Sequence, residues 1–471
     1  MPPLRIRAAA DAPRDGRRWV AVGFAASVAT SLVSWVMPQP VGSIPGRAIS
    51  ALLVLACAVM LLAWWQLGPR FPHPLAATVV WALPLLAAAP LMSLDVWAYL
   101  TQGWMVINGH DPYVMMLGEP GLPGIEVGEH WIHTTSVYPA GSLLVFGAVY
   151  WLSGGIPWLG VLLFRVLHLG CLFVVAWAVK VVAARFGVSR TAAWWVGIAS
   201  PLLLIQWIGG VHNDAVLVAV LALAVVAASR GGWSGLVLGG ALVGLALTVK
   251  QSGAAAGLGI VALAWAATPG KSWAQLAGRA VAAGLAAVVA FGGISLATFG
   301  FGWSALTAGS PLEVTSNSPW SWIVQAVANY GPEAWFAPAL RSCTLLAGLT
   351  VLAAWVWLVV RFGPRPEEPG RPWAIFLGGL LAFALLGPGL QAWYLTWVVP
   401  FVALAQPGVR RQRVWLAGTV VTMLLTPLQF VTGVFPSVPL AIVGTWWLWR
   451  RLSQMPGAIW GPESDRAGTL G

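Results

Sequence analysis

Long apolar runs recur along nearly the whole chain and are separated by short stretches rich in Gly, Pro and Arg. A helix needs roughly 20 mostly apolar residues to cross about 30 Å of hydrocarbon, so these runs predict membrane-spanning helices. We therefore expect an all-α, polytopic membrane protein with about 13–15 transmembrane helices. The fourteen runs that we interpret as spans are 18–37, 49–66, 75–92, 157–181, 191–207, 211–229, 233–249, 252–268, 277–300, 339–361, 373–390, 392–406, 414–432 and 436–450.

Composition agrees with this interpretation. Of the 471 residues, 59% are hydrophobic and 8% are charged, whereas a soluble domain carries a larger charged fraction. The three cysteines, Cys57, Cys171 and Cys343, lie in apolar runs, so no disulfide framework is expected. The N-terminus is basic and the first apolar run lacks a small-residue cleavage site, so we expect no cleaved signal peptide.

Residues 138–153 decide the orientation of the segments that follow them. They are apolar but short, and we interpret them as a juxtamembrane or re-entrant helix. If they crossed the membrane, the basic cluster Lys180–Arg190 would face outward, against the tendency of Lys and Arg to remain in the cytoplasm. With the N-terminus inside, only Arg47, Lys250 and Arg341 among the basic loop residues then face outward.

The net charge of +11 reflects this topology. Because the basic residues fall mainly in cytoplasmic loops, we do not expect nucleic acid as a partner. The outer face is acidic instead. Its expected carboxylates are Asp95, Asp111, Glu119, Glu126, Glu129, Asp214, Glu313 and Glu333.

The polar connections divide the chain into five regions. The two largest connections both fall outside the membrane. The expected regions are 1–92, the basic N-terminus and first helices; 93–156, the first large outward loop with its juxtamembrane helix; 157–300, a group of transmembrane helices; 301–338, the second large outward loop; and 339–471, the C-terminal helices and cytoplasmic tail.

The sequence "SLDVWAYLTQGWMVINGHDPYV" (residues 93–114) opens the first outward loop with polar residues. If its first part is a short interfacial helix, Asp95, Tyr99 and Gln102 lie on one face of that helix. A partly desolvated carboxylate is a stronger base, which suits general-base catalysis by Asp95. The alternative is a helix-capping or surface carboxylate. Asp111-Pro112-Tyr113, further along, suits either substrate binding or a simple turn.

Two shorter outward turns contain further polar side chains. The turn "GGVHNDAVL" contains His212, Asn213 and Asp214; Asn and Asp are also ordinary helix N-caps, but His212 is not needed for capping. The turn "LTVKQSG" contains Lys250, the only outward lysine. Lys250 suits capture of an anion, or simple snorkelling at the end of a span.

A third outward turn, "GPGLQAWYLTW", contains Gln391, Trp393 and Tyr394. Its rings suit stacking on a sugar, or an aromatic belt at the membrane interface. Polar groups near a membrane are expensive and usually functional, so the outward turns together predict one site on the outer side.

Other polar residues suit structural roles. Arg165 and His168, at i and i+3 within a span, suit pairing with a loop carboxylate. The stretch "EVGEHWIHT" contains Glu126, Glu129 and two histidines that could hold a cation, but the spacing is loose and we assign no metal. The chain contains no Walker loop and no G-x-S-x-G motif.

Three stretches together carry a resemblance to a known family. "SLDVWAYLTQGWMVINGHDPYV", "GGVHNDAVLVAVLALAV" and "LQAWYLTWVVPFVAL" make the chain similar, over roughly residues 90–405, to the polyprenol-phosphomannose-dependent α-1,6-mannosyltransferases of actinobacterial envelopes. These are GT-C class membrane glycosyltransferases. In that class an acidic residue in the first large outward loop is the catalytic base, a role that the resemblance assigns to Asp95. The family usually carries Tyr-Gly-Pro after this loop, where this chain has "VYPAG".

The resemblance implies a reaction and its partners. Mannose would move from a polyprenyl-phosphate-mannose donor to a hydroxyl of a lipid-anchored mannan of the lipomannan or lipoarabinomannan type, with inversion, at the outer face of the cell membrane. No cofactor is implied. Lys250 and His212 would stabilise the leaving lipid phosphate. The alternatives are an arabinosyl, glucosyl or protein O-mannosyl transferase on the same scaffold, and a lipid or glycan transporter.

Overall fold

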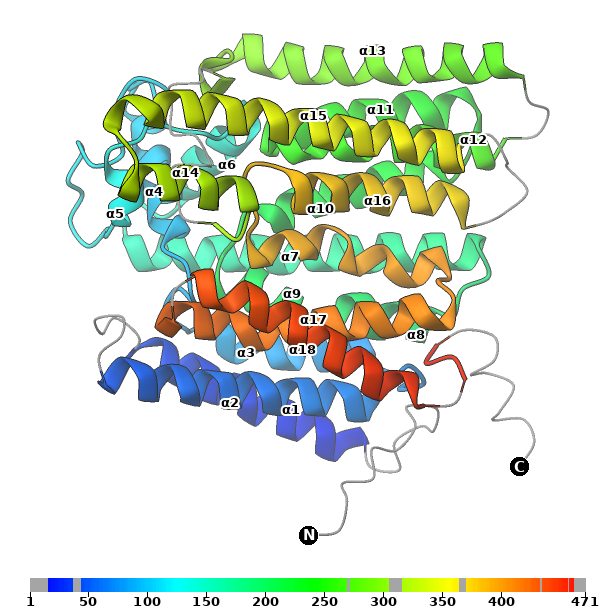
Figure 1. The fold of residues 1–471 in the computed structure, drawn as a ribbon, viewed down its shortest axis with the longest axis horizontal. Coiled ribbons are helices and arrows are strands. Elements are labelled where there is room, and N and C mark those ends of the chain that lie inside the picture. Colours follow the sequence, from blue (N-terminus) through cyan, green and yellow to red (C-terminus); the bar gives the residue numbers. More distant parts are fainter. Residues whose placement is uncertain are drawn as a thin grey trace. The chain divides into compact units, whose positions relative to one another are not determined.

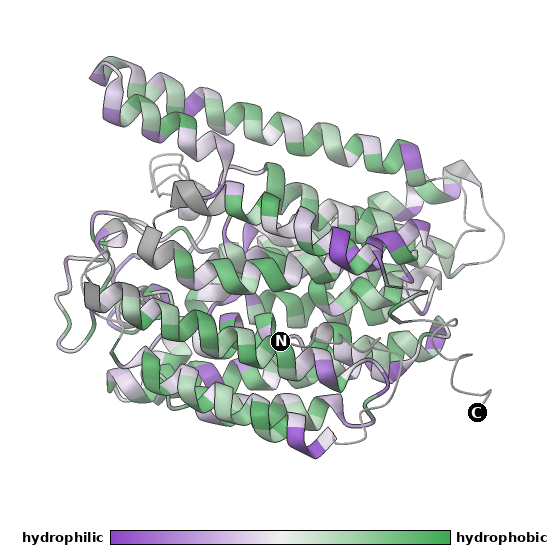
Figure 2. Cartoon of the chain, turned by 60° about the horizontal axis from the view of Figure 1, so that its bottom comes forward, coloured by the Kyte–Doolittle hydropathy of each residue, from purple (hydrophilic) through white to green (hydrophobic). Residues whose placement is uncertain are grey.

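The computed structural model describes residues 16–36, 44–268, 272–304, 316–363, 370–432, 434–455 and 457–460. Glu313 and the last part of the expected cytoplasmic tail lie outside these residues. Within them the chain forms helices and no strands (Figure 1). The helices are predominantly hydrophobic along their length (Figure 2).

In the described residues five helices are long and apolar enough to cross a membrane, which confirms an all-α, polytopic membrane protein. A sixth candidate is a pair of short helices bent by 41° at a break between them. The five spans are Ala48–Leu67, Pro157–Arg185, Gly232–Val249, Ala274–Ala297 and Glu333–Phe362, and the bent pair is Arg190–Ile198 with Pro201–Gly209.

Five further apolar helices of 10–17 residues are shorter than a perpendicular crossing requires. They are Pro74–Leu85, Ala140–Leu152, Asp214–Ala228, Gln251–Ala266 and Arg371–Leu386. Fewer of the described helices are both long and apolar enough to span a membrane than the sequence has apolar runs. Hydrophobicity marks a buried or membrane segment, but it does not reveal where the helix itself ends.

The chain forms two compact units. The first consists of residues 1–92, 179–209 and 399–471, and the second of residues 93–178 and 210–398. The first unit contains α1 (Gly16–Ser34), α2 (Ile44–Leu67), α3 (Pro74–Leu85), α8 (Arg190–Ala193), η1 (Trp194–Ile198), α9 (Pro201–Leu203), η2 (Leu204–Gly209), η7 (Val399–Ala405), α17 (Val409–Thr432) and α18 (Val434–Ser453).

The second unit contains most of α7 and the elements that form the candidate site. Its elements are α4 (Asp95–Ile107), α5 (Glu129–Ile132), α6 (Ala140–Leu152), α7 (Pro157–Arg185), α10 (Asp214–Ala228), α11 (Gly232–Val249), η3 (Gln251–Ala256), α12 (Gly257–Ala266), α13 (Trp273–Ala297), η4 (Gly302–Ser304), α14 (Pro319–Tyr330), η5 (Glu333–Trp335), α15 (Phe336–Phe362), α16 (Arg371–Leu386) and η6 (Ala392–Trp397).

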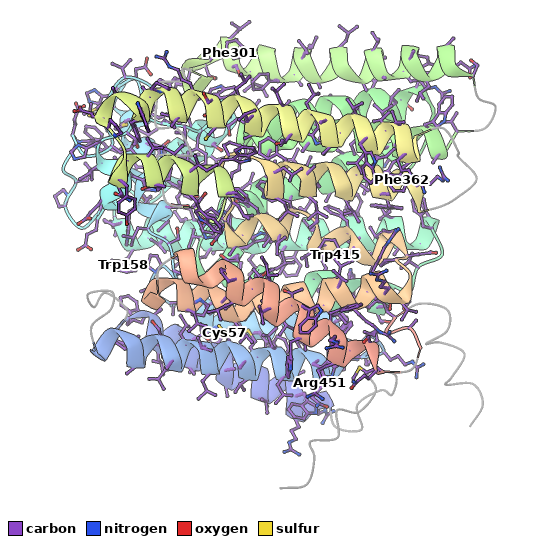
Figure 3. The ribbon with its side chains drawn as sticks, in the orientation of Figure 1. Cys57, Trp158, Phe301, Phe362, Trp415 and Arg451 are labelled. Carbon is purple, nitrogen blue, oxygen red and sulfur yellow. The ribbon has the colours of Figure 1, made fainter. Side chains whose placement is uncertain are left out.

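A reciprocal tryptophan pair holds the first unit together. Trp64 of α2 donates its indole N–H to the carbonyl of Trp195, and Trp195 donates to the carbonyl of Trp64, each at 2.8 Å. The two rings stack with centroids 4.8 Å apart. Both indoles are almost fully buried, so each buried donor is satisfied inside the unit. The three cysteines are buried, and none is in a disulfide in the structure; Cys57 is labelled in Figure 3.

The second unit places α4 directly against α6. Gly103 of α4 makes this close approach possible, because a Cβ atom there would collide with the backbone of Phe146. The aromatic rings of Tyr99 and Phe146 stack at 4.5 Å across the same contact. Ten of the thirteen α4 residues are buried, so α4 is enclosed by protein.

The run 392–406 forms two short 3-10 helices, η6 and η7, in place of one α-helical span. A 3-10 helix has three residues per turn, so side chains at i and i+3 align. Tyr394 and Trp397 accordingly stack with ring centroids 4.3 Å apart. The tight local winding brings these two rings onto one face.

Candidate active site

Asp95 is the first residue of α4, and its carboxylate contacts two other segments of the second unit. Oδ1 accepts a hydrogen bond from the indole N–H of Trp131 at 3.2 Å, and Oδ2 lies 3.4 Å from Nδ1 of His212. The backbone N–H of Asp95 donates to the hydroxyl of Ser93 at 3.1 Å. Only 8% of Asp95 is exposed. A surface carboxylate is therefore the wrong interpretation, and Asp95 lies in an enclosed, polar environment.

His212 lies between Asp95 and an aromatic ring. Its imidazole stacks on the indole of Trp393, with ring centroids 3.9 Å apart and planes 16° from parallel. The preceding residue, Val211, has φ of +57° and is fully buried. A β-branched residue in this left-handed region is strained, and such strain persists only where the surrounding packing imposes it. The chain thus presents His212 to Asp95 from a strained turn.

Asp214 and Lys250 form a buried ion pair. Nζ of Lys250 donates to both oxygens of Asp214, at 2.9 and 3.0 Å. The indole N–H of Trp397 also donates to Asp214. The ammonium group lies over the rings of Tyr394 and Trp397, 4.8 and 5.6 Å from their centroids.

The charge of Lys250 depends on this pairing. Burial lowers the pKa of its ammonium group, but Asp214 and, to a lesser extent, Asp95 raise the pKa, and the net pKa lies above that of a free lysine. Lys250 is therefore protonated at neutral pH. Because Asp95 contributes to this shift, the Asp95 and Asp214 carboxylates belong to one electrostatic environment.

Asn213 ties the turn before α10 to neighbouring helices. Although it occupies the N-cap position, its side chain makes no capping hydrogen bond. Its amide instead donates to the hydroxyl of Ser142 at 2.6 Å, and Ser142 donates to the carbonyl of Val249, also at 2.6 Å. The capping interpretation is therefore wrong for Asn213, which connects the turn to α6 and to the end of α11.

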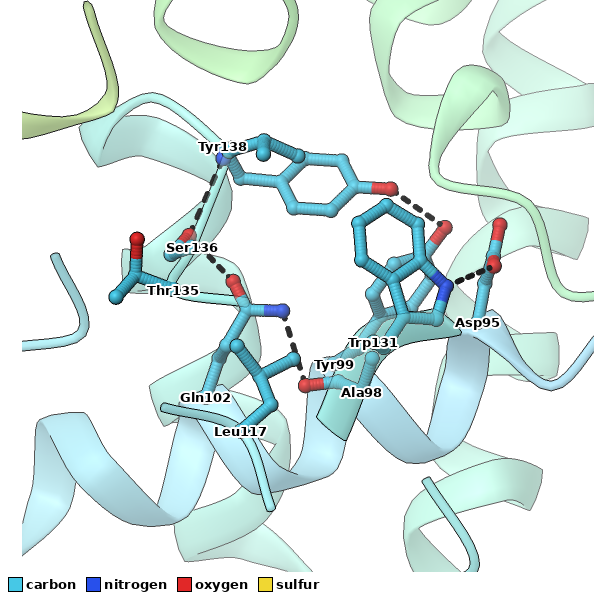
Figure 4. Close-up of a pocket in the computed structure, with 10 residues that line it drawn as sticks. Asp95, Ala98, Tyr99, Gln102, Leu117, Trp131, Thr135, Ser136 and Tyr138 are labelled. Carbon is cyan, nitrogen blue, oxygen red and sulfur yellow. Dashed lines mark hydrogen bonds between the residues drawn. The ribbon is translucent and has the colours of Figure 1, made fainter. Parts of the chain in front are cut away.

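A small pocket adjoins Asp95 and is lined by polar side chains (Figure 4). Gln102 accepts a hydrogen bond from Ser136 at 2.5 Å, and the hydroxyl of Tyr138 donates to that of Tyr99 at 3.3 Å. The full lining is Asp95, Ala98, Tyr99, Gln102, Leu117, Trp131, Thr135, Ser136, Val137 and Tyr138. Asp95, Tyr99 and Gln102 thus face the same pocket, as their helical spacing predicts.

The two tyrosines of this pocket are hydrogen-bonding groups and not bases. Burial raises the pKa of Tyr99 and of Tyr138 well above that of a free phenol, and the nearby Asp95 carboxylate raises both further. Both phenols are therefore neutral at physiological pH. The hydroxyl of Thr135, in the same pocket, is buried and has no hydrogen-bond partner in the part of the chain that the structure describes.

The structure brings most of the sequence-predicted residues together. Asp95, Tyr99, Gln102, His212, Asn213, Asp214, Lys250, Trp393 and Tyr394 are joined by the contacts above. Asp111 differs, because it is exposed and its carboxylate accepts from the backbone N–H of Tyr113 at 2.8 Å, as in a simple turn. Tyr113 donates its hydroxyl to the carbonyl of Tyr138 at 3.0 Å. Gln391 immediately precedes η6, where its carbonyl accepts from the N–H of Tyr394.

Sequence reasoning missed Trp131, Thr135, Ser136, Tyr138 and Trp397. Trp131 lies within the stretch "EVGEHWIHT", the next three lie just after it, and Trp397 ends the "QAWYLTW" motif. Their proximity to conspicuous polar residues was an available signal, but 31 tryptophans make any one of them inconspicuous. Among the described residues, no three His, Cys, Asp or Glu side chains lie close enough to hold a metal ion.

Comparison with known proteins identifies the family. The profile of the family described as "Alpha-(1->6)-mannopyranosyltransferase, N-terminal domain" matches residues 19–267. The chain is 30% identical over 395 residues to alpha-(1->6)-mannopyranosyltransferase A of Mycobacterium tuberculosis, covering 78% of this chain and 73% of that protein.

Two proteins of Corynebacterium glutamicum are also similar. Alpha-(1->6)-mannopyranosyltransferase A is 34% identical over 175 residues, covering 37% of this chain and 35% of that protein. Alpha-(1->6)-mannopyranosyltransferase B is 26% identical over 404 residues, covering 76% and 65%. Because the family profile matches more than half of the chain and a relative is 30% identical over most of both proteins, the chain belongs to the alpha-(1->6)-mannopyranosyltransferase family and is a membrane mannosyltransferase.

Proposed function

We propose that this mannosyltransferase moves mannose from polyprenyl-phosphate-mannose to a hydroxyl of a lipid-anchored mannan, forming an α-1,6 linkage on the extracytoplasmic side of the cell membrane. The observation that carries the proposal is the enclosed Asp95 carboxylate, held by Trp131 and near His212 beside a polar pocket. The sugar and the linkage follow the names of the relatives. The lipid donor follows the resemblance of the outward motifs.

Asp95 is the general base of the proposed reaction. Its carboxylate takes the proton from the acceptor hydroxyl as the hydroxyl oxygen bonds to the anomeric carbon of mannose. The bond from that carbon to the phosphate oxygen breaks, and lipid phosphate leaves with the electron pair. Because attack occurs opposite the leaving group, a β-linked donor yields an α-linked product. Asp95 then loses its proton to water.

Trp131 and His212 position the base. The indole N–H of Trp131 holds Oδ1 of Asp95, and Oδ2, which lies 3.4 Å from Nδ1 of His212, is the oxygen to which we assign the acceptor proton. The imidazole is itself held against Trp393 by ring stacking. A base whose orientation is set by its neighbours loses less entropy on the way to the transition state.

Lys250 stabilises the phosphate that leaves. An ammonium group has three N–H donors, and two of the contacts from Lys250 go to Asp214. The ammonium group also lies over the rings of Tyr394 and Trp397, and its third donor would turn to a phosphate oxygen. Since Asp214 keeps Lys250 protonated, the cation is in place before negative charge develops on the leaving oxygen.

The cavity beside Asp95 is too small for a water molecule in this structure, so a sugar hydroxyl would reach its polar lining only after the surrounding side chains move apart. The hydroxyls of Tyr99 and Thr135 can donate hydrogen bonds, and the side-chain amide of Gln102 can donate and accept them. Among the described residues the buried hydroxyl of Thr135 has no hydrogen-bond partner, and a sugar hydroxyl would supply one. Trp393, next to His212, supplies a ring for contact with a sugar face.

The experiment that tests this function uses purified protein in proteoliposomes. It measures transfer from polyprenyl phosphates carrying mannose, glucose or arabinose to a short α-1,6-linked mannoside. We expect transfer from the mannose donor alone, an α-1,6 product, and loss of transfer in Asp95→Asn. Asp111→Asn is the matched control, because Asp111 is exposed and closes a turn.

Other outcomes would replace the proposal. Transfer of glucose or arabinose in preference to mannose would make the donor assignment wrong. Movement of the lipid across the bilayer that survives Asp95→Asn, with no glycosidic product, would indicate a transporter.

A further inference from the structure

A groove of about 480 Å³ runs along α17 and α18 in the first unit, and no residue of the candidate site lines it. The two helices form a hairpin, and the start of α17 meets the end of α18. Arg413 of α17 donates to the carbonyls of Ser453, Met455 and Gly457, which follow or end α18. The groove is lined by Arg410, Val414, Ala441, Ile442, Thr445, Trp446 and Trp449.

The walls of the groove are apolar and exposed at the surface of the protein. Val414 is 47% exposed, Ile442 is 66% exposed and Trp446 is 52% exposed. Such large apolar side chains lining one open groove form a surface that a hydrocarbon chain can cover.

One end of the groove is strongly basic. The guanidinium of Arg410 lies over the ring of Trp449 at 5.8 Å, and those of Arg450 and Arg451 lie over Trp446 and Trp447 at 4.8 and 5.4 Å. Arg451 is labelled at the end of α18 in Figure 3. Neither helix contains Asp or Glu. The basic end therefore has no acidic partner on its own elements.

A tryptophan N–H adds a neutral donor at this end. The Nε1 atom of Trp449 is buried and has no hydrogen-bond partner among the described residues. Arg410 lies over the same indole. A group with several acceptor oxygens at this position would satisfy both the guanidinium and the indole N–H.

We propose that the groove binds an anionic phospholipid, with its phosphate at Arg410 and Trp449 and an acyl chain along Val414, Ile442 and Trp446. Basic pockets between membrane helices recognise anionic lipid headgroups by this combination of charge and apolar surface. A second copy of the chain fits less well, because pairing two such grooves would bring their arginine clusters together. The site is independent of the mannose transfer reaction.

The test compares two lipids with identical acyl chains on the purified, detergent-solubilised protein by native mass spectrometry. We expect the protein to retain phosphatidylglycerol in preference to phosphatidylcholine. Arg410→Gln should weaken retention of phosphatidylglycerol about fivefold, the loss typical of one basic residue at a lipid headgroup. Arg411→Gln is the matched control, since Arg411 is adjacent and exposed but does not line the groove.

A second pair of variants tests the apolar part of the site without changing charge. Ile442→Trp fills the groove and should reduce retention of phosphatidylglycerol. Val443→Trp alters a neighbouring residue that is 61% exposed and lies outside the groove, so it should have no effect. Both substitutions fall at exposed positions of α18, and thermal unfolding without added lipid checks that each protein is folded.

Three results would overturn the proposal. Equal retention of the two lipids would remove the role of the phosphate. Equal losses in Arg410→Gln and Arg411→Gln would indicate a diffuse basic surface and no site. A dimer that disappears in Ile442→Trp would identify a second copy of the chain as the occupant.

Discussion

Oδ2 of Asp95 and Nδ1 of His212 lie 3.4 Å apart, although the two residues come from different segments of the chain. Neither residue is at the surface: Asp95 is 8% exposed and His212 is 1% exposed. Burying a carboxylate and an imidazole together costs free energy, and polar groups buried in a membrane protein are usually functional. Substitutions at and around this pair therefore give the most direct tests of the proposed catalysis.

Asp95→Asn should lower kcat by about 10²–10⁴-fold, the range typical for loss of a positioned base. The amide retains the size of the carboxylate and can still accept a hydrogen bond from Trp131, but it cannot take the acceptor proton. The measurement is initial rates at saturating donor and acceptor. Near-normal turnover would remove Asp95 from the reaction and leave Asp214 as the remaining buried carboxylate of the site.

Trp131→Phe tests whether the indole N–H tunes the base. A hydrogen bond to the ionised carboxylate favours the charged form, so its loss makes Asp95 easier to protonate. The acidic limb of the kcat/KM profile should then move to higher pH, with a smaller change in the maximum rate. Trp104→Phe is the matched control, because Trp104 also belongs to the outward segment but stacks on His110. An unchanged pH profile in Trp131→Phe would restrict Trp131 to packing.

Gly103→Ala should destabilise the protein, because the added methyl group meets the backbone of Phe146 where α4 packs on α6. Overpacking of this kind typically costs about 1–3 kcal/mol of unfolding free energy. Gly170→Ala is the matched control. Gly170 lies in α7 with nothing within 4 Å of the added Cβ, and alanine is the better helix former there by up to about 1 kcal/mol. Thermal unfolding of both variants in the same detergent measures the difference in their stability. Equal melting temperatures would contradict the close contact between α4 and α6.

The orientation of the chain can be tested with single cysteines in a protein lacking Cys57, Cys171 and Cys343. Cysteine at Glu119 or Tyr330, both exposed, should react with an impermeant thiol reagent in intact cells. Cysteine at Arg411, also exposed, should react only after permeabilisation. The expected sidedness follows from the distribution of Lys and Arg along the loops. Labelling at Arg411 in intact cells would reverse the assignment of that loop.

The polar part of the site was predictable because polar residues are rare in this chain. Asp95, His212, Asp214 and Lys250 interrupt long apolar runs, and each interruption is expensive in or near a membrane. Hydrophobic patterning likewise predicted an all-α membrane protein. Both inferences rest on contrasts that are visible along the chain itself.

The contacts that organise the site were not predictable in this way. Trp131 and Trp397 become important only because folding brings their N–H groups to Asp95 and Asp214. Apolar composition gives no sign that η6 and η7 are 3-10 helices, since hydrophobicity does not distinguish the winding of a buried helix. Lys250 looked like an isolated cation, and its pairing with Asp214 depends on a tertiary contact.

The Lys250–Asp214 pair gives a prediction that separates charge pairing from catalysis. Lys250→Met leaves a carboxylate that is 1% exposed without its cation, and loss of one partner of a buried pair typically costs about 3–5 kcal/mol of unfolding free energy. Asp214→Asn removes the carboxylate that raises the pKa of Lys250 the most, while burial continues to lower that pKa.

The pH dependence of unfolding should therefore change in a defined direction. In the wild-type protein the raised pKa of Lys250 contributes stability at neutral pH. This contribution is lost only as pH rises from the pKa of free lysine through the raised pKa of the folded protein. In Asp214→Asn the pKa of Lys250 should fall below that of free lysine, so the unpaired buried charge destabilises the protein at neutral pH, and stability should rise as pH increases toward the pKa of free lysine. Melting temperatures across the alkaline range measure this change.

The double variant Lys250→Met/Asp214→Asn completes the cycle. Because it leaves neither charge buried alone, it should be more stable than Lys250→Met. If Lys250 also holds the donor phosphate, transfer in the double variant should stay low although the protein has regained stability. Recovery of kcat and KM together with stability would mean that Lys250 serves only to neutralise Asp214, and the phosphate would then require a different cation.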